Sequence, residues 1–292
     1  MPLASIPSPG HASWRLGPLP VHAYALCVVA GVIVAVVVAS RRYRSHATDR
    51  RRGVILDVAA WAVPFGLAGA VVHAVLVDGK HDFSFISGLW HAATVVVAAL
   101  GVPGAVALGT AGAWIACRRA GVPLGEVAAA AAPAVMFGLA VGTLGNWWAQ
   151  QLYGRPSSWW WAVQISPTRR VPGYENYSTF QPVFLYQALW EVVVGVAVIW
   201  AARRFALTGP RTFLLAVAGY AAGDCWTELA RIGPLLRMFG IRYAALQDAL
   251  LFVLAVAALY LTRPRPKPAP RPHPRPDPVS FVDDSPGDVM SS

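Results

Sequence analysis

Long apolar stretches, each about as long as a bilayer is thick, constrain the fold of this chain more than any other feature. A helix needs roughly 20 apolar residues to cross the hydrocarbon core of a membrane. About seven such stretches occur, at about 21–40, 54–77, 96–117, 124–145, 183–202, 212–229 and 244–262. Since a helix satisfies its own backbone hydrogen bonds in lipid, the sequence predicts an all-α polytopic membrane protein with about seven transmembrane helices.

Composition supports a chain whose solvent is mostly lipid. Of the 292 residues, 56% are hydrophobic and only 13% are charged, against about 25% charged residues in a soluble domain. In such a chain the net charge of +10 concerns membrane orientation, and we expect no nucleic-acid partner. The cysteines Cys27, Cys117 and Cys225 lie in or beside apolar stretches, so we expect no disulfide framework.

Basic residues are distributed unevenly between the two sets of loops. One set, which includes residues 41–52 and the tail after 262, holds 16 Lys and Arg residues, and the other set holds 8. The richer set should be cytoplasmic. The sequence therefore predicts an N-terminus outside and a cytoplasmic C-terminus, which agrees with an odd number of spans.

The chain divides into one membrane domain, residues 1–262, and a tail, residues 263–292. The largest external segment, 146–182, is too short for a separate domain and is rich in Trp, Tyr and Arg, a composition typical of a membrane surface. The tail alternates Pro with Arg and Lys before it turns acidic. It cannot bury a core, so we expect it to be disordered on the cytoplasmic side.

The stretch from Gly142 to Pro156 has the composition of a helix that emerges into the headgroup layer. It combines small residues, amide side chains, the adjacent Trp147 and Trp148, and Arg155. Indole rings favour that layer, and a guanidinium group can bind a lipid phosphate through two hydrogen bonds. The simpler interpretation is an anchor that only fixes the depth of the helix.

Acidic residues inside the apolar stretches are informative because charge within a bilayer is costly. Glu191 and Asp248 lie deep in their stretches, and Asp224, Glu228 and Arg231 share one helix face at i, i+4 and i+7. The last three predict either an ion pair at a helix end or the polar wall of a cavity. Both interpretations stay open.

Polar residues also occur near the predicted outer surface. His22, Tyr24, His73 and Asn146 could converge on one cavity. A lone His is more often satisfied by local partners than catalytic, and no two His residues have metal-ligand spacing. We find no nucleotide-binding, hydrolase or zinc signature.

Several of these residues, taken in order, resemble a known family. They are Ile6-Pro7-Ser8-Pro9, Leu16 to Leu26, Asp57 with Pro64-Phe65-Gly66, Leu144-Gly145-Asn146, Leu152-Tyr153-Gly154-Arg155-Pro156, Pro182 with Leu185-Tyr186, and Glu228 with Arg231. Their order, spacing and seven-span topology are similar to those of the bacterial prolipoprotein diacylglyceryl transferases over about residues 5–262.

The resemblance implies a reaction and its partners. Members of this family transfer the diacylglyceryl group of phosphatidylglycerol to the lipobox cysteine thiol of a prolipoprotein, and glycerol phosphate leaves. The expected partners are phosphatidylglycerol, the lipobox segment and membrane lipids, and the expected location is the bacterial inner (cytoplasmic) membrane. Neither a metal nor a cofactor is implied.

The resemblance also implies site residues. Those implied in catalysis are Asn146, which would donate a hydrogen bond, Arg155 and Arg231, which would hold phosphate, and Glu228. Those implied in substrate binding are His22, Tyr24, Gln151 and Tyr186, of which the two tyrosines would line the lipid cleft.

The chain departs from the family pattern at four polar positions. Thr143 and Asp224 stand where the family has arginine, Gln151 where it has Glu, and Gln181 where it has His. Because a leaving phosphate is stabilised by cations, an active transferase here depends on Arg155, Arg231 and the Arg169-Arg170 pair. Two alternatives stay open: a catalytically impaired homologue that binds lipid or lipoprotein without transfer, and a membrane transporter.

Overall fold

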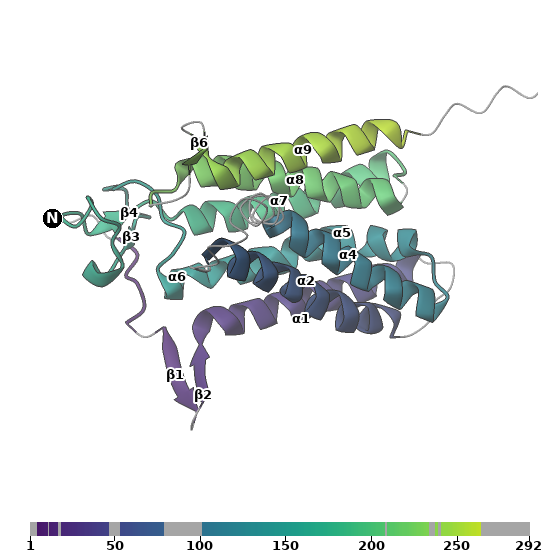
Figure 1. The fold of residues 1–292 in the computed structure, drawn as a ribbon, viewed down its shortest axis with the longest axis horizontal. Coiled ribbons are helices and arrows are strands. Elements are labelled where there is room, and N and C mark those ends of the chain that lie inside the picture. Colours follow the sequence, from purple (N-terminus) through teal and green to yellow (C-terminus); the bar gives the residue numbers. More distant parts are fainter. Residues whose placement is uncertain are drawn as a thin grey trace, which may run out of the picture. The chain divides into compact units, whose positions relative to one another are not determined.

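Long helices make up most of the protein (Figure 1). The computed structural model describes residues 5–10, 12–16, 19–46, 53–78, 101–207, 209–233, 237–238 and 241–263. The long helices are α1 (Ala23–His46), α2 (Val54–Asp78), α4 (Gly101–Ala120), α5 (Leu124–Leu144), α7 (Val183–Arg204), α8 (Gly209–Ala230) and α9 (Tyr243–Leu261). Among the described residues, α1, α5, α7 and α9 include segments that are long and apolar enough to cross a membrane.

Each predicted apolar stretch coincides with one of these helices, to within a few residues where the structure describes it. The third stretch was predicted from 96, but residues 79–100 lie outside the described residues and α4 begins at Gly101. The tail also lies outside them, except for Arg263. An all-helical membrane protein is therefore confirmed, while the number of spans and their orientation stay predictions.

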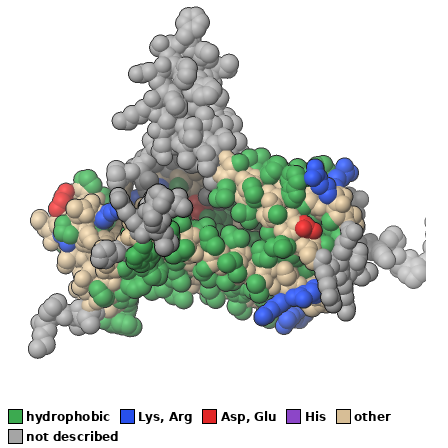
Figure 2. Space-filling model, turned by 90° about the horizontal axis from the view of Figure 1, so that it is seen from below, with side chains coloured by type: hydrophobic (Ala, Val, Ile, Leu, Met, Phe, Trp, Pro, Cys, Tyr) green, Lys and Arg blue, Asp and Glu red, His purple; other side chains and the backbone are tan. Residues whose placement is uncertain are grey.

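Apolar side chains cover the outside of the helices, as a protein surrounded by lipid requires. Val193, Val196, Leu250 and Val253 each expose more than half of their surface. Figure 2 shows hydrophobic side chains over much of the described surface on the face that it draws. A soluble monomer rarely exposes so much continuous apolar surface.

Short elements gather at one end of the helices (Figure 1). They are the paired strands β1 (Ser13–Leu16) with β2 (Leu19–His22), β3 (Val163–Gln164) with β4 (Thr179–Phe180), and β5 (Arg237–Met238) with β6 (Ile241–Arg242), together with helix α6 (Asn146–Ala149) and the 3-10 helix η1 (Pro167–Arg169). All three pairs are antiparallel. We call this end, including residues 146–182, the strand end.

The strand end has a small core of its own. Tyr153, Val163, Ile165, Phe180 and Phe184 are buried against one another. The N-terminal segment joins this core, because the backbone N–H of Ile6 donates to the Ala162 carbonyl at 2.8 Å. The loops between α5 and α7 are therefore ordered by packing and can hold side chains in fixed positions.

Arginine residues gather at the opposite end of the helices. Figure 2 shows two groups of basic side chains there. The guanidinium carbon of Arg118 lies 4.8 Å from the centre of the Trp114 ring, and that of Arg119 lies 4.5 Å from the Trp61 ring. Such cation–π contacts suit an interface where one side is apolar and the other is wet.

Helices α1 and α5 approach closely because glycine residues face each other. A Cβ atom at Gly138 would lie 2.6 Å from the Gly31 carbonyl oxygen, and one at Gly31 would overlap the Gly138 backbone. Small residues permit this approach, and close packing is what holds helices together in lipid. Helix α5 also packs on α7 and α8, so it is the central helix of the bundle.

We predict that Gly138→Ala destabilises the protein by about 1–3 kcal/mol, the usual cost of overpacking a tight contact. Gly142→Ala is the matched control, because a Cβ atom there, one turn further along α5, would have its nearest neighbour at 3.9 Å. Thermal unfolding in detergent measures the difference. Equal melting temperatures for the two variants would show that the α1–α5 contact is looser than described.

Candidate functional site

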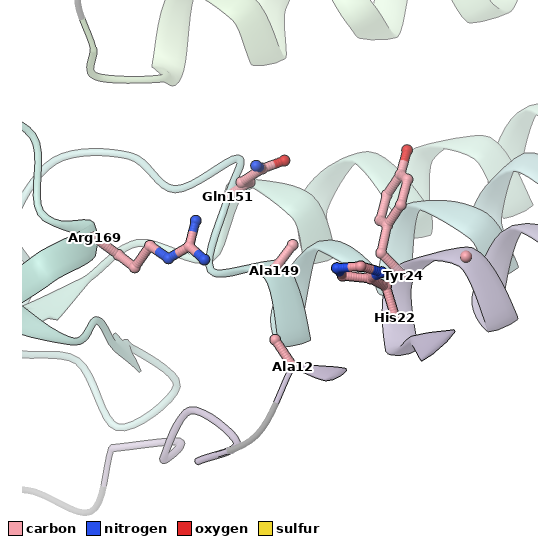
Figure 3. A pocket seen from close by; sticks show the side chains of 7 residues that line it. Ala12, His22, Tyr24, Ala149, Gln151 and Arg169 are labelled. Atoms are coloured by element: carbon pink, nitrogen blue, oxygen red, sulfur yellow. The ribbon is translucent and has the colours of Figure 1, made fainter. Parts of the chain in front are cut away.

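A cavity of about 430 Å³ lies at the strand end (Figure 3). Its lining residues come from the segment before β1, the β2–α1 junction, α6, the loop after α6 and η1; they are Ala12, His22, Tyr24, Ala25, Ala149, Gln151 and Arg169. Figure 3 shows the His22 imidazole and the Arg169 guanidinium pointing from opposite sides toward the space beside Ala149. The structure thus brings three predicted substrate-binding residues, His22, Tyr24 and Gln151, to one cavity.

An unusual backbone conformation places Gln151 beside this cavity. Gln150 and Leu152, on either side of it, have φ angles of 51° and 55°. Residues other than glycine rarely adopt this left-handed region, and surrounding contacts must hold them there. One such contact is the hydrogen bond from the Ser166 N–H to the Gln150 side-chain oxygen, at 2.8 Å.

Of the two adjacent arginines, Arg170 binds backbone carbonyls and Arg169 lines the cavity. Arg170 donates to the backbone carbonyls of Ile165 at 3.0 Å and Glu175 at 2.7 Å. Arg169 is exposed and lines the cavity, and its own carbonyl accepts a 2.6 Å hydrogen bond from the Tyr153 hydroxyl. Burial raises the pKa of Tyr153, so this phenol keeps its proton and remains a donor.

A second cationic group lies where α8 ends. Glu228 is buried and forms an ion pair with Arg231, which is one of the two interpretations that their i, i+3 spacing left open. The other carboxylate oxygen of Glu228 lies 3.7 Å from Nη1 of Arg242, the last residue of β6. Arg242 also donates to the backbone carbonyls of Glu228 at 2.5 Å and Gly233 at 3.4 Å. We call Arg231, Glu228 and Arg242 the charge triad.

The charge triad lies against the loop after α6 that carries Leu152-Tyr153-Gly154-Arg155-Pro156 of the family resemblance, which we call the signature loop. Gly154 and Arg231 form an antiparallel bridge, and the N–H of Ile232 donates to the Tyr153 carbonyl at 3.4 Å. A Cβ atom at Gly154 would lie 2.9 Å from the Ala230 carbonyl oxygen. Glycine at 154 therefore lets the end of α8 touch the signature loop.

A chain of hydrogen bonds links the two positions where the family has arginine. The Thr143 hydroxyl donates to Glu191 at 3.1 Å, the Gln187 amide donates to Glu191 at 3.4 Å and to Asp224 at 2.9 Å, and the Tyr220 hydroxyl donates to Asp224 at 3.1 Å. We call these five residues the inner chain. Glu191 is only 1% exposed. Buried carboxylates need such donors, and here every donor is neutral.

The inner chain offers no cation of its own to an anionic group. Asp248 on α9 is also buried, which adds a further acid near Asp224. Across the part of the chain that the structure describes, no three His, Cys, Asp or Glu side chains are close enough together to hold a metal ion. The inner chain is thus a pair of acids, Glu191 and Asp224, with neutral hydrogen-bond donors. The cations Arg169 and Arg231 lie nearer the strand end.

Five of the predicted site residues lie away from the cavity lining: Glu228 and Arg231 of the charge triad, and Asn146, Arg155 and Tyr186. Asn146 is buried, and its amide donates to the Thr143 carbonyl at 2.8 Å. The Tyr186 hydroxyl accepts a 2.9 Å hydrogen bond from the Trp161 indole. Arg155 is exposed beside Gly154. The side chain of His73, predicted to face the same cavity, lies outside the described residues.

The sequence reasoning missed Gln187 and Arg242. Gln187 could have been noticed as an amide inside an apolar helix, four residues before Glu191. The sequence analysis counted Arg242 only among the charges of the loops. Its partners, Glu228 and Gly233, lie at and just after the end of α8. No spacing pattern in the sequence connects it to Glu228.

Comparisons with known proteins show the family of this chain. The family model described as prolipoprotein diacylglyceryl transferase matches residues 11–261. A phosphatidylglycerol–prolipoprotein diacylglyceryl transferase of Streptomyces griseus is 42% identical over 263 residues, which cover 90% of this chain and 79% of the relative. One from Mycobacteroides abscessus is 40% identical over 272 residues, covering 89% of this chain and 79% of the relative.

We predict that Thr143→Val destabilises the protein by about 1–3 kcal/mol, because the buried Glu191 carboxylate loses a donor. Thr143→Ser keeps the hydroxyl group and is the matched control. Thermal unfolding of the purified variants in detergent measures both. If Thr143→Val and Thr143→Ser had the same melting temperature, the Thr143–Glu191 hydrogen bond would contribute nothing to stability.

Proposed function

Because this chain belongs to the prolipoprotein diacylglyceryl transferase family, we propose that it transfers the diacylglyceryl group of phosphatidylglycerol to the lipobox cysteine of prolipoproteins. The observation that carries the proposal is the strand end. There the family signature loop, a cavity with a cationic side chain and the Glu228–Arg231 ion pair lie together.

The reaction sets the chemical demands on this site. The cysteine sulfur, as a thiolate, forms a bond to the glycerol carbon, and the bond from that carbon to the phosphate oxygen breaks. The phosphate takes the electron pair, and the thiol proton goes to a base or to water. The transition state therefore gains negative charge on the leaving phosphate, which guanidinium groups stabilise.

Residues of the strand end can meet these demands. Arg169 and Arg231 are the cations best placed to bind the phosphate. Arg155, next to Gly154, is a third. We assign His22, Tyr24 and Gln151 to the headgroup cavity, and Glu228 to holding Arg231. We assign Asn146 to catalysis and Tyr186 to lipid binding. Asn146 would act by supporting the end of α5, and Tyr186 by supporting the loop at Trp161.

We further propose the topology that the sequence predicts. Seven helices cross the bacterial cytoplasmic membrane, with the strand end and N-terminus outside and the arginine-rich end and tail, residues 263–292, in the cytoplasm. Lipobox segments would then reach the strand end from the outer leaflet. The gathering of arginine residues at the end of the helices opposite the cavity supports this orientation.

One observation favours a second candidate, a homologue that binds lipid or lipoprotein without transfer. The inner chain places Thr143 and Asp224 where the family has arginine, and its acids are already satisfied by neutral donors. Relatives show that one bacterium can hold two members, since Streptomyces coelicolor has transferases numbered 1 and 2. A second member in the same cell would relax selection on this one.

A transfer assay separates the two candidates. Purified protein in phosphatidylglycerol vesicles is incubated with a lipobox-cysteine peptide, and mass spectrometry detects the diacylglyceryl adduct. We expect an adduct that disappears with a Cys-to-Ser peptide or with phosphatidylcholine vesicles. Absence of product, while a competent relative works in parallel, would overturn transfer and favour the binding homologue.

We predict that Arg231→Gln lowers the rate of transfer about 100- to 1,000-fold, the usual loss when one well-placed stabilising donor is removed. Arg41→Gln is the matched control, because it removes the same charge from an exposed position at the arginine-rich end. Initial rates at saturating peptide measure both. Wild-type rates in the Arg231 variant would remove this residue from the site.

A further inference from the structure

Arg242 is an arginine whose side chain is almost fully buried in a membrane protein. It lies at the start of α9, and only 7% of its surface is exposed. Burying a guanidinium group is costly unless it is paired and hydrogen-bonded. Its position against the last turn of α8 therefore calls for an explanation.

We infer that Arg242 is a positioning residue of the transfer site, which keeps Arg231 oriented and the charge triad net positive. This inference rests on the proposed function, because it concerns how that site binds phosphate. It adds Arg242, the last residue of β6, to a site whose other cations include Arg231, directly after α8, and Arg169.

The charge of the triad follows from its members. Arg231 and Glu228 alone form a neutral pair, in which the carboxylate cancels the guanidinium charge that a phosphate would feel. Arg242 lies 3.7 Å from the second oxygen of the same carboxylate and restores one positive charge. Because interactions between charges are stronger in a poorly solvated site than in water, this difference matters for an anionic headgroup.

Asp224 increases the need for that charge. It lies one helical turn before Glu228, at a position where the family has arginine, so the face that leads to Arg231 carries two acids in succession. The inner chain satisfies Asp224 with neutral donors only. Within the described residues, Arg242 is a cation that reaches this end of α8 from strand β6, just before α9.

The geometry of Arg242 also explains why an arginine occupies the position. Its Nη1 and Nη2 atoms donate to two backbone carbonyls, those of Glu228 and Gly233. Carbonyl groups at a helix C-terminus lack partners within the helix and attract cations. The planar guanidinium fork thus fixes the turn that carries Arg231, which a lysine ammonium group cannot do in the same way.

Four variants test the inference: Arg242→Gln, Arg242→Lys, Glu228→Gln, and the double variant Glu228→Gln with Arg242→Gln. Each is first checked by thermal unfolding in detergent. Transfer is then measured against the surface fraction of phosphatidylglycerol, which separates the apparent KM for lipid from kcat. Retention of phosphatidylglycerol against phosphatidylcholine by each purified variant gives a second readout that needs no turnover.

We expect Arg242→Gln to raise the apparent KM and lower kcat/KM by up to about 100-fold. The double variant restores the net charge of the triad and should recover at least about tenfold of that loss, since a glutamine at 228 can still accept a hydrogen bond from Arg231. Arg242→Lys, which keeps the charge without the fork, should fall between Arg242→Gln and the wild type. A purely structural role for Arg242 predicts no recovery in the double variant.

Several outcomes would overturn the inference. They are a folded Arg242→Gln variant with wild-type KM and lipid retention, or a folded double variant no better than Arg242→Gln. If Arg242→Gln does not fold, Arg242→Lys decides, and wild-type kcat/KM in that variant overturns the positioning role. If the wild type forms no adduct, the proposed transfer fails by itself, and the same comparisons of lipid retention decide the role of Arg242.

Discussion

The amide of Gln187, shared between two buried carboxylates, is the interaction on which the inner part of this site depends. A carboxylate inside a membrane bundle must be paired or hydrogen-bonded, and at this site the arginines of the family pattern are absent. Gln187 and the Thr143 hydroxyl donate to Glu191, while Gln187 and Tyr220 donate to Asp224. Among the described residues, neutral groups thus donate to both carboxylates, and the inner chain itself contains no guanidinium group.

In the proposed function, the guanidinium groups that bind the phosphate are therefore those near the strand end. Arg169 faces the cavity there, and the Glu228–Arg231 pair lies against the signature loop at Gly154. The same loop is held in place by packing around Tyr153 and Phe180 and by the Tyr153 hydroxyl, which bonds to the Arg169 backbone. The charge distribution at this site thus differs from the pattern that the family resemblance implies, since Thr143 and Asp224 stand where that pattern has arginine.

Much of the fold could be predicted from the sequence, because apolar length alone predicts a membrane helix, and the helices begin and end close to the predicted boundaries. The Glu228–Arg231 pair was predictable because helical spacing fixes which side chains meet. The contacts of Arg242 were not, since they join the end of β6 to Glu228 on α8 and to Gly233, which no helical spacing relates. Nor did the sequence separate Arg169 from Arg170, because that depends on the carbonyls that Arg170 reaches, those of Ile165 and Glu175.

The most direct test locates the headgroup itself. A phosphatidylglycerol carrying a photoreactive group on its glycerol headgroup is incorporated into vesicles with the protein, irradiated, and mapped by peptide mass spectrometry. The account predicts labels in the strand end, around residues 149–155, 166–170 and 228–233. Labels confined to Thr143, Gln187, Glu191 and Tyr220 would contradict it, because the headgroup would then bind at the inner chain despite the missing arginines.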